Sequence, residues 1–216
     1  MDSLVYDLPA LTIRRISVSE MDNNVYLLTA KASGEQVLID AADDLPAIRQ
    51  LLAGAAADTS AAPRLALIAT THRHWDHVRA LPELVAATGA PTAAGADDAD
   101  ALPVPVDRRL AHGDTVAVDG FQLEAVHLRG HTPGSIAFVY RDPDGPPHIF
   151  SGDSLFPGGV GNTQKDPERF NSLLADVTDR LFGTYPDAAV VHPGHGKPTT
   201  LGAERPHLDE WRARGW

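Results

Sequence analysis

A dense group of potential metal ligands is the feature that most constrains this sequence. Four such side chains, His72, His74, Asp76 and His77, lie directly after the apolar run 65–69. A short apolar run predicts a buried strand, so the ligands should stand at the end of a rigid element. Neutral imidazoles and carboxylates suit zinc, iron or manganese. The cluster therefore predicts a binuclear metal site, in an enzyme that attacks its substrate with metal-bound hydroxide.

Composition narrows the class of protein. The chain has 216 residues, of which 43% are hydrophobic, so it can bury a substantial core, and we expect one domain over residues 1–216. It contains no cysteine, so a metal must be held by nitrogen and oxygen. The formal net charge of −11 argues against a nucleic-acid partner, because such a surface repels phosphate backbones.

The sequence carries no sign of export or membrane insertion. Its longest apolar runs are too short to cross a bilayer. Residues 1–4 (MDSL) lack the basic and apolar regions of a secretion signal, so we expect a cytoplasmic protein. We expect its partner to be a small-molecule substrate and not a membrane.

Apolar periodicity predicts alternating strands and helices. In the first half, strands are expected at 11–18, 24–30, 36–40 and 64–69, and helices at 43–53 and 76–88. In a second half, from near Pro91, we expect strands at 115–118, 121–127, 135–140, 148–151 and 188–191, a helix opening at Asp166-Pro167, and a last helix at 201–212. This alternation predicts a layered α/β fold with two sheets.

The other informative stretches mostly follow a predicted strand and contain glycine or proline. They are Asp40 and the segments 130–135 (GHTPGS), 151–154 (SGDS), 157–162 (PGGVGN) and 193–196 (PGHG). Ligands at strand ends sit on a rigid frame, and a neighbouring glycine lets the backbone turn sharply beside a metal. The segment 157–162 lacks the Lys-Ser/Thr pair of a phosphate-binding loop, so we expect it to form a flexible pocket rim.

The order H-x-H-x-D-H, G-H-T-x-G, G-D, G-H resembles that of the metallo-β-lactamase-fold hydrolases, closest to the glyoxalase II-like branch, over roughly residues 20–200. The resemblance implies an α/β, four-layer αββα sandwich of two mixed β-sheets flanked by helices. It implies two divalent metal ions, with zinc preferred over iron or manganese. In this pattern His72, His74 and His131 would hold the first ion, Asp76, His77 and His195 the second, and Asp153 would bridge both, with Asp76 also required for catalysis.

The resemblance further implies hydrolysis of a small thioester or ester by a hydroxide between the two ions. Two departures from glyoxalase II bear on the substrate. Ser135 stands where that enzyme's motif ends in a histidine, and only about twenty residues follow His195, too few for its glutathione-binding helical domain. S-lactoylglutathione itself is therefore not the expected substrate.

Other activities on this fold stay open. A persulfide dioxygenase of this fold uses one iron, which His72, His131 and Asp153 would hold here. A lactonase, another hydrolase of the fold and a non-catalytic metal-binding protein are further alternatives.

Several neighbouring residues have two interpretations. Asp40 is expected either to hydrogen-bond a metal-bound histidine or to cap a strand end. Trp75 either walls the substrate pocket or packs, and His127 either supports a ligand or packs. We expect a packed, hydrogen-bonded role for His192, a solvated helix end for Asp97, Asp98 and Asp100, and surface or structural roles for His112, His148 and His207.

Overall fold

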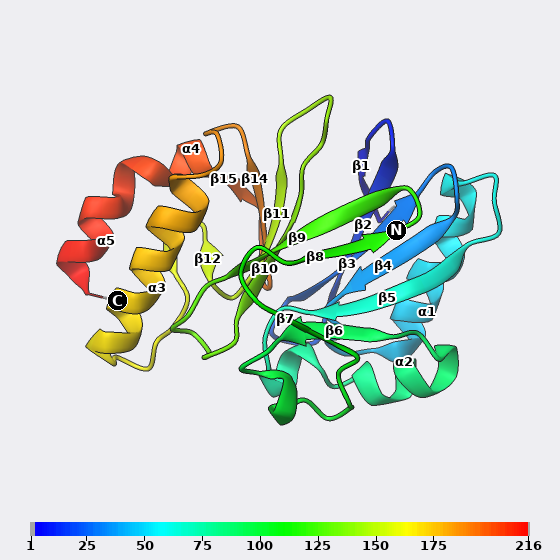
Figure 1. The fold of residues 1–216 in the computed structure, drawn as a ribbon, viewed down its shortest axis with the longest axis horizontal. Helices are drawn as coiled ribbons and strands as arrows, with labels where there is room; N and C mark the ends of the chain where they lie inside the picture. Colours follow the sequence, from blue (N-terminus) through cyan, green and yellow to red (C-terminus); the bar gives the residue numbers. More distant parts are fainter. Residues whose placement is uncertain (1–2, 216) are drawn as a thin grey trace.

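Two large mixed β-sheets pack face to face in the structure, a computed structural model that describes residues 3–215 (Figure 1). The first sheet follows the chain order: β1 (Leu4–Asp7), β2 (Leu11–Val18), β3 (Asn23–Ala30), β4 (Glu35–Ile39), β5 (Arg64–Thr70), β6 (Thr92–Gly95) and β7 (Arg108–Leu110). The second has the order β15 (Thr199–Thr200), β14 (Val190–Pro193), β11 (His148–Gly152), β10 (Ile136–Tyr140), β9 (Phe121–His127) and β8 (Thr115–Val118). A separate hairpin joins β12 (Leu155–Phe156) and β13 (Gly159–Val160).

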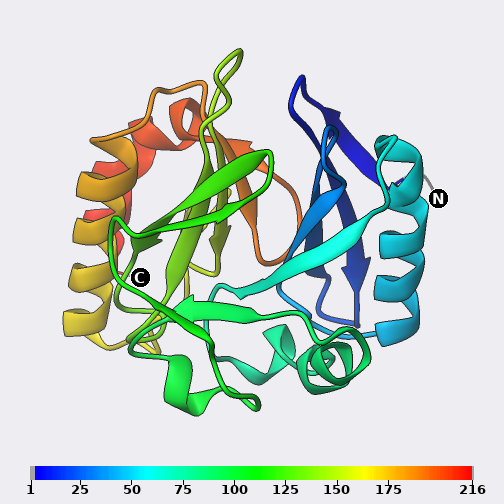
Figure 2. The same ribbon diagram turned by 45° about the vertical axis from the view of Figure 1, so that its right-hand side comes forward.

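Helices cover the outer face of each sheet (Figure 2). The first sheet carries α1 (Leu45–Gly54) and α2 (Leu81–Thr88), and the second carries α3 (Pro167–Val177), α4 (Leu201–Glu204) and α5 (Leu208–Arg214). Short 3-10 segments lie at Ala55–Asp58, Trp75–His77, Ala99–Ala101 and Arg205–His207, and a π segment at Thr178–Phe182 continues α3.

The buried hydrophobic residues form three clusters, as four layers require. Val37 and Ile39 of β4 face the second sheet and pack in one cluster with Phe138 of β10. Leu38, between them, points to the opposite face and joins the cluster under α1 and α2, because side chains alternate along a strand. Val139 of β10 likewise turns outward into the cluster under α3 and α5. This arrangement confirms the predicted αββα sandwich.

Parallel strand pairs bring the ligand-bearing loops to one edge. Strands β4 and β5 pair in parallel, so Asp40 and Thr71 leave the first sheet at the same end. Strands β11 and β14 also pair in parallel, so Asp153 and Gly194 leave the second sheet together. At this edge the backbone amide of Ile136 donates to the carbonyl of Thr71 at 2.8 Å, which links the two sheets.

One predicted helix begins later than expected. The segment 76–88 is helical only from Leu81, and Trp75–His77 forms a 3-10 turn instead. The amides of Arg79 and Ala80 donate to carbonyls of residues 42 and 41, each at 3.1 Å. These contacts with the loop after β4 replace the bonds that a helix would make.

The second half of the chain does not begin near Pro91 as predicted, because β6 and β7 extend the first sheet. Strands as short as β6 and β7 do not show a recognisable alternation of apolar and polar residues, so the sequence did not predict them.

Within residues 3–215, no helix combines the length and the apolar character needed to cross a membrane.

Candidate metal centre

All seven predicted ligands come together at the edge where the two sheets meet. Within each of three groups, the ligand atoms lie within 4.8 Å of one another. The groups are His72, His74 and His131; Asp76, His77 and His195; and His72, His77 and Asp153. The first two are the sets that the sequence predicts for two separate ions, and the third connects them through Asp153.

The Asp153 carboxylate lies between the two histidine groups. Its oxygens are 3.4 Å from Nε2 of His77, 3.4 Å from Nε2 of His195 and 3.6 Å from Nε2 of His131. The Nε2 atoms of His77 and His195 are themselves 3.2 Å apart. A carboxylate in this position has the two oxygens needed to bridge a pair of cations about 3.5–4 Å apart.

Hydrogen bonds at Nδ1 orient the histidine rings. His131 Nδ1 donates to the carbonyl of Asn162 at 2.8 Å, and His195 Nδ1 donates to the carbonyl of Met21 at 2.7 Å. Because a carbonyl oxygen only accepts, the proton sits on Nδ1 and the Nε2 lone pair is free in the neutral ring. This is the tautomer that a metal-binding histidine needs.

The free atoms of the centre fit divalent cations. Among the described residues, Nε2 of His72, Nε2 of His131 and Oδ1 of Asp153 are buried without a hydrogen-bond partner. Burying a polar atom without a partner is costly, so clustered unpartnered atoms of this kind are typical of a ligand-binding site. The donors are imidazole nitrogen and carboxylate oxygen, which suit zinc, iron and manganese.

Asp40 supports histidines of both groups. Its Oδ2 accepts from Nδ1 of His77 at 2.9 Å and from the Thr71 hydroxyl at 2.8 Å. Because that hydroxyl donates to Asp40, its oxygen accepts from Nδ1 of His72, 3.0 Å away. Of the two interpretations of Asp40, the structure favours hydrogen bonding to candidate ligands. Its φ of 59° lies in the left-handed region, a strained conformation typical of functional sites.

Burial and nearby carboxylates shift the pKa values of the candidate histidine ligands in opposite directions. Burial lowers the pKa of His72 well below its ordinary value, so this imidazole is neutral. Burial acts the same way on His77, but the nearby carboxylates of Asp153 and Asp40 outweigh it and raise the pKa to about 10. The pKa of His195 is also raised to about 10, by Asp153 and Asp76 against the effect of burial. Protons therefore compete with a cation for these nitrogens.

Asp98 has a role that the sequence did not reveal. The prediction of a solvated helix end is wrong for this residue, because its carboxylate is buried. It accepts from the Thr132 hydroxyl at 2.5 Å, from the Gly134 amide at 3.0 Å and from the Arg73 amide at 3.1 Å. Asp98 thus ties the segment of His72 and His74 to the loop of His131. Its neighbours Asp97 and Asp100 are exposed, as predicted.

Asn23 is a second residue that supports a candidate ligand and that the sequence did not indicate. It is buried at the start of β3, and its side-chain amide donates to Oδ2 of Asp76 at 2.9 Å. Nothing in the sequence distinguishes Asn23 from an ordinary polar residue at a strand end.

Two glycines are required by close packing. A Cβ on Gly194 would lie 2.3 Å from Oδ1 of Asp153 and 2.7 Å from Cε1 of His77. A Cβ on Gly152, whose φ is 51°, would lie 2.5 Å from the Thr71 hydroxyl. Any side chain at either position would displace a residue of the centre.

His127 and Trp75, for which the sequence allows two interpretations each, also lie near the centre. His127 Nε2 donates to the carbonyl of Pro133 at 2.7 Å, so it supports the loop that carries His131. The Trp75 side chain is 59% exposed and lines a small surface cavity, with the Arg79 guanidinium 3.8 Å from its ring centroid.

His148, His192 and the segment 157–162 each make structural contacts. His192 is buried with its Nε2 2.9 Å from Nδ1 of His148, which confirms a packed, hydrogen-bonded role and gives His148 a structural one. The segment 157–162 contains the β12–β13 turn, and its Asn162 carbonyl is the one that orients His131.

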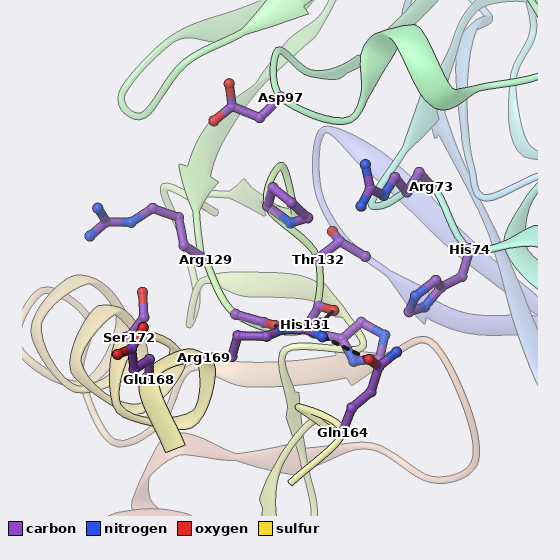
Figure 3. A pocket seen from close by; sticks show the side chains of 12 residues that line it. Arg73, His74, Asp97, Arg129, His131, Thr132, Gln164, Glu168, Arg169 and Ser172 are labelled. Carbon is purple, nitrogen blue, oxygen red and sulfur yellow. Dashed lines mark hydrogen bonds between the residues drawn. The ribbon is translucent and has the colours of Figure 1, made fainter. Parts of the chain in front are cut away.

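An open cleft of about 670 Å³ adjoins the first histidine group (Figure 3). His74 and His131 line it, and residues of α3 form one wall. Its lining also includes Arg73, Arg129, Arg169, Gln164, Glu168 and Ser172. The cleft is large enough for a small-molecule substrate.

Comparison with known proteins identifies the family. A model of the Metallo-beta-lactamase superfamily matches residues 18–195. The chain belongs to the metallo-β-lactamase superfamily. A hydroxyacylglutathione hydrolase of Fuscovulum blasticum is 40% identical to it over 207 residues, which is 90% of this chain and 76% of that protein. The human hydroxyacylglutathione hydrolase-like protein is 32% identical over 86% of this chain and 59% of its own length.

These relatives place this metallo-β-lactamase superfamily member in the glyoxalase II-like branch of hydrolases. The chain spans about half the length of several of them, such as the hydroxyacylglutathione hydrolase of Jannaschia sp., which is 37% identical over 50% of its length.

Several solved structures resemble this one. ETHE1 from Myxococcus xanthus has a TM-score of 0.77 at 27% identity, covering 93% of this chain and 84% of that one. TTHA1623, solved in a di-iron-bound form, has a TM-score of 0.70 at 33% identity, covering 88% of this chain and 96% of that one. The BLEG-1 B3 metallo-β-lactamase has a TM-score of 0.76 at 24% identity, which supports the fold.

Proposed function

We propose that this protein is a binuclear metal-dependent hydrolase that cleaves a small thioester or ester. One observation carries the proposal: two three-residue ligand groups lie side by side, with Asp153 between them. The relatives named as hydroxyacylglutathione hydrolases support a thioester substrate.

The seven residues would divide between two divalent ions. His72, His74 and His131 would hold the first, Asp76, His77 and His195 the second, and Asp153 would bridge. We propose zinc, with iron or manganese as the alternatives that the same donors accept. When bound, such ions lower the pKa of a water to about 7 and polarise a carbonyl oxygen.

The protein's own residues prepare the site for this chemistry. Burial would raise the pKa of Asp76, but the His195 imidazole and the Asn23 amide beside its carboxylate outweigh burial and hold the pKa well below its usual range. The carboxylate therefore stays charged at neutral pH. Asp40, Thr71 and the carbonyls of Asn162 and Met21 fix four imidazole rings before any ion arrives. The cleft beside His74 and His131 would orient the substrate.

A one-iron dioxygenase is the alternative that the ligand types alone leave open. His72, His131 and Asp153 are available for it, and Asp76, His77 and His195 form a second group. The relatives named as hydroxyacylglutathione hydrolases favour hydrolysis over this alternative.

The test combines metal analysis with activity. The protein is loaded with zinc, iron or manganese and assayed against S-lactoyl thioesters, p-nitrophenyl esters and a lactone, and for oxygen uptake with glutathione persulfide. We expect two ions per chain and thioester hydrolysis, abolished in Asp76→Ala and retained in the exposed control Asp209→Asn. One iron per chain with oxygen uptake would establish the alternative, and two bound ions with no turnover of any substrate would refute the hydrolase.

A further inference from the structure

Three arginines line the cleft beside His74 and His131, in a chain whose net charge is −11. Two of them are committed to the fold. Arg129 donates from Nε and Nη2 to the Asp176 carboxylate at 2.8 and 2.7 Å, and its guanidinium points away from His131 (Figure 3). Arg169 donates to the carbonyls of Gly130 and His131, so it holds the loop that carries this candidate ligand.

Arg73 is different. Its side chain is 39% exposed, and its one ion pair within residues 3–215 joins Nε to Oδ1 of Asp98 at 3.6 Å. Asp98 also accepts from the Arg73 backbone amide, so the same buried carboxylate contacts both the backbone and the side chain of Arg73. No hydrogen bond from its terminal Nη atoms to another described residue is present. Arg73 thus offers the terminal nitrogens of a guanidinium fork, the group that best matches a carboxylate.

The location of Arg73 connects it to the reaction. It immediately precedes His74, and both side chains face the same cleft (Figure 3). We propose that Arg73 binds a carboxylate of the substrate and so determines which esters or thioesters the enzyme accepts. This inference rests on the proposed function, to which it adds the substrate class.

The other charges of the cleft limit how many carboxylates fit. Asp97 and Glu168 also line it, and Asp97 is exposed, 4.0 Å from His127 Nε2. A second carboxylate on the ligand would meet these acidic groups, and like charges repel. The cleft therefore suits a ligand with a single carboxylate beside Arg73.

Binding of non-hydrolysable thioethers tests the role of Arg73. S-methyl-N-acetylcysteine carries one carboxylate, and its primary carboxamide, which contains no ester or thioester, carries none. Affinities for both are measured by NMR titration of the metal-loaded protein. We expect the acid to bind roughly tenfold more tightly than the amide, with a smaller difference at high salt. Arg73→Gln should remove most of this preference, and Arg73→Lys should keep part of it. Arg64→Gln, which alters an exposed arginine paired with Glu35 at the far end of β5, should leave the preference unchanged.

Two results would overturn the inference: equal affinities for acid and amide in the wild-type protein, or a preference that survives in Arg73→Gln. A lower melting temperature of Arg73→Gln with an unchanged preference would mean that Arg73 only compensates the charge of Asp98. If Arg73→Gln does not fold, Arg73→Lys decides, because a preference equal to wild type would then contradict recognition by the guanidinium fork. Hydrolysis of the thioester in S-lactoyl-N-acetylcysteine and in its primary carboxamide is measured in parallel. Failure to cleave either would refute the proposed function, while the binding preference would still decide the role of Arg73.

Discussion

Asp40 accepts two hydrogen bonds from Thr71, one from the backbone amide and one from the hydroxyl, each 2.8 Å long. The same carboxylate accepts from His77, and Thr71 in turn accepts from His72. One acidic residue at the end of β4 therefore orients a histidine of each ligand group. The two candidate metal positions are coupled through the protein as well as through Asp153.

Asp40→Asn should weaken metal binding at both positions. Asparagine tolerates the left-handed backbone, but its neutral amide cannot accept all the bonds that the carboxylate accepts. We expect roughly a 10- to 100-fold loss of metal affinity, measured by competition with a chromophoric chelator. Thr71→Val is the matched comparison, because it removes the link to His72 but leaves His77 bonded to Asp40. Thr71→Val should therefore lower the affinity for the ion at His72 more than the affinity for the ion at His77. An equal loss of affinity for both ions would contradict the separate roles of Thr71 and Asp40.

Gly194→Ala should disrupt the centre with little effect elsewhere. The added methyl would lie 2.3 Å from Oδ1 of Asp153, closer than any tolerated contact, so the carboxylate must move. We expect metal content and hydrolysis to fall by at least about tenfold, with circular dichroism unchanged. Gly54→Ala, where a Cβ meets nothing within 4 Å, is the control. It should retain full activity, and a Gly194→Ala variant that also does so would rule out the packing argument.

Asp98→Ala should destabilise the fold, because it leaves the Gly134 amide and the Thr132 hydroxyl without their buried acceptor. We expect the free energy of unfolding of the metal-free protein to fall by about 1–3 kcal/mol. Urea denaturation measures this change. The adjacent variant Asp97→Ala removes an exposed carboxylate and should shift stability by less than about 0.5 kcal/mol. Similar losses in both variants would mean that Asp98 has no special structural role.

The buried pair His148 and His192 should make the fold sensitive to acid. Burial lowers the pKa of His148 to about 4 and that of His192 to about 3, the latter also through its neighbour His148. Both values lie below the ordinary value of 6.5, so the unfolded chain takes up protons first. The stability due to the neutral pair is therefore complete above about pH 6.5 and is lost as the pH falls toward 4 and 3, by up to about 1.4 kcal/mol per pH unit for each histidine.

Urea denaturation of the chelator-treated protein between pH 7 and pH 4.5 checks this expectation. His148→Asn removes one titrating ring and should flatten the pH dependence. His207→Asn, which changes an exposed histidine beside Glu210, should leave it unaltered. A slope in His148→Asn equal to that of the wild-type protein would show that other groups govern the acid response.

The fold class and the residue types of the site were predictable because their signals are local. The apolar runs that become β4, β5 and β10 lie between turn residues, and each candidate ligand is a histidine or aspartate at or just beyond a strand end. The elements that the sequence did not predict correctly are short, such as β6 and β7, or begin at a different residue, such as α2. The expected helix at 76–88 loses its first turn because amides of residues 79 and 80 bond to the loop after β4, which no local pattern records.

The sequence by itself determined which side chains are available to hold metal ions, because that requires only the right residue types in the right order. The tertiary structure decided how they are supported. His195 is oriented by a carbonyl 174 positions away in the chain, Asp76 by an amide 53 positions away, and Asp98 serves two loops at once. Contacts of this kind exist only after the two sheets have packed, since packing places the ends of parallel strands from distant segments at one edge.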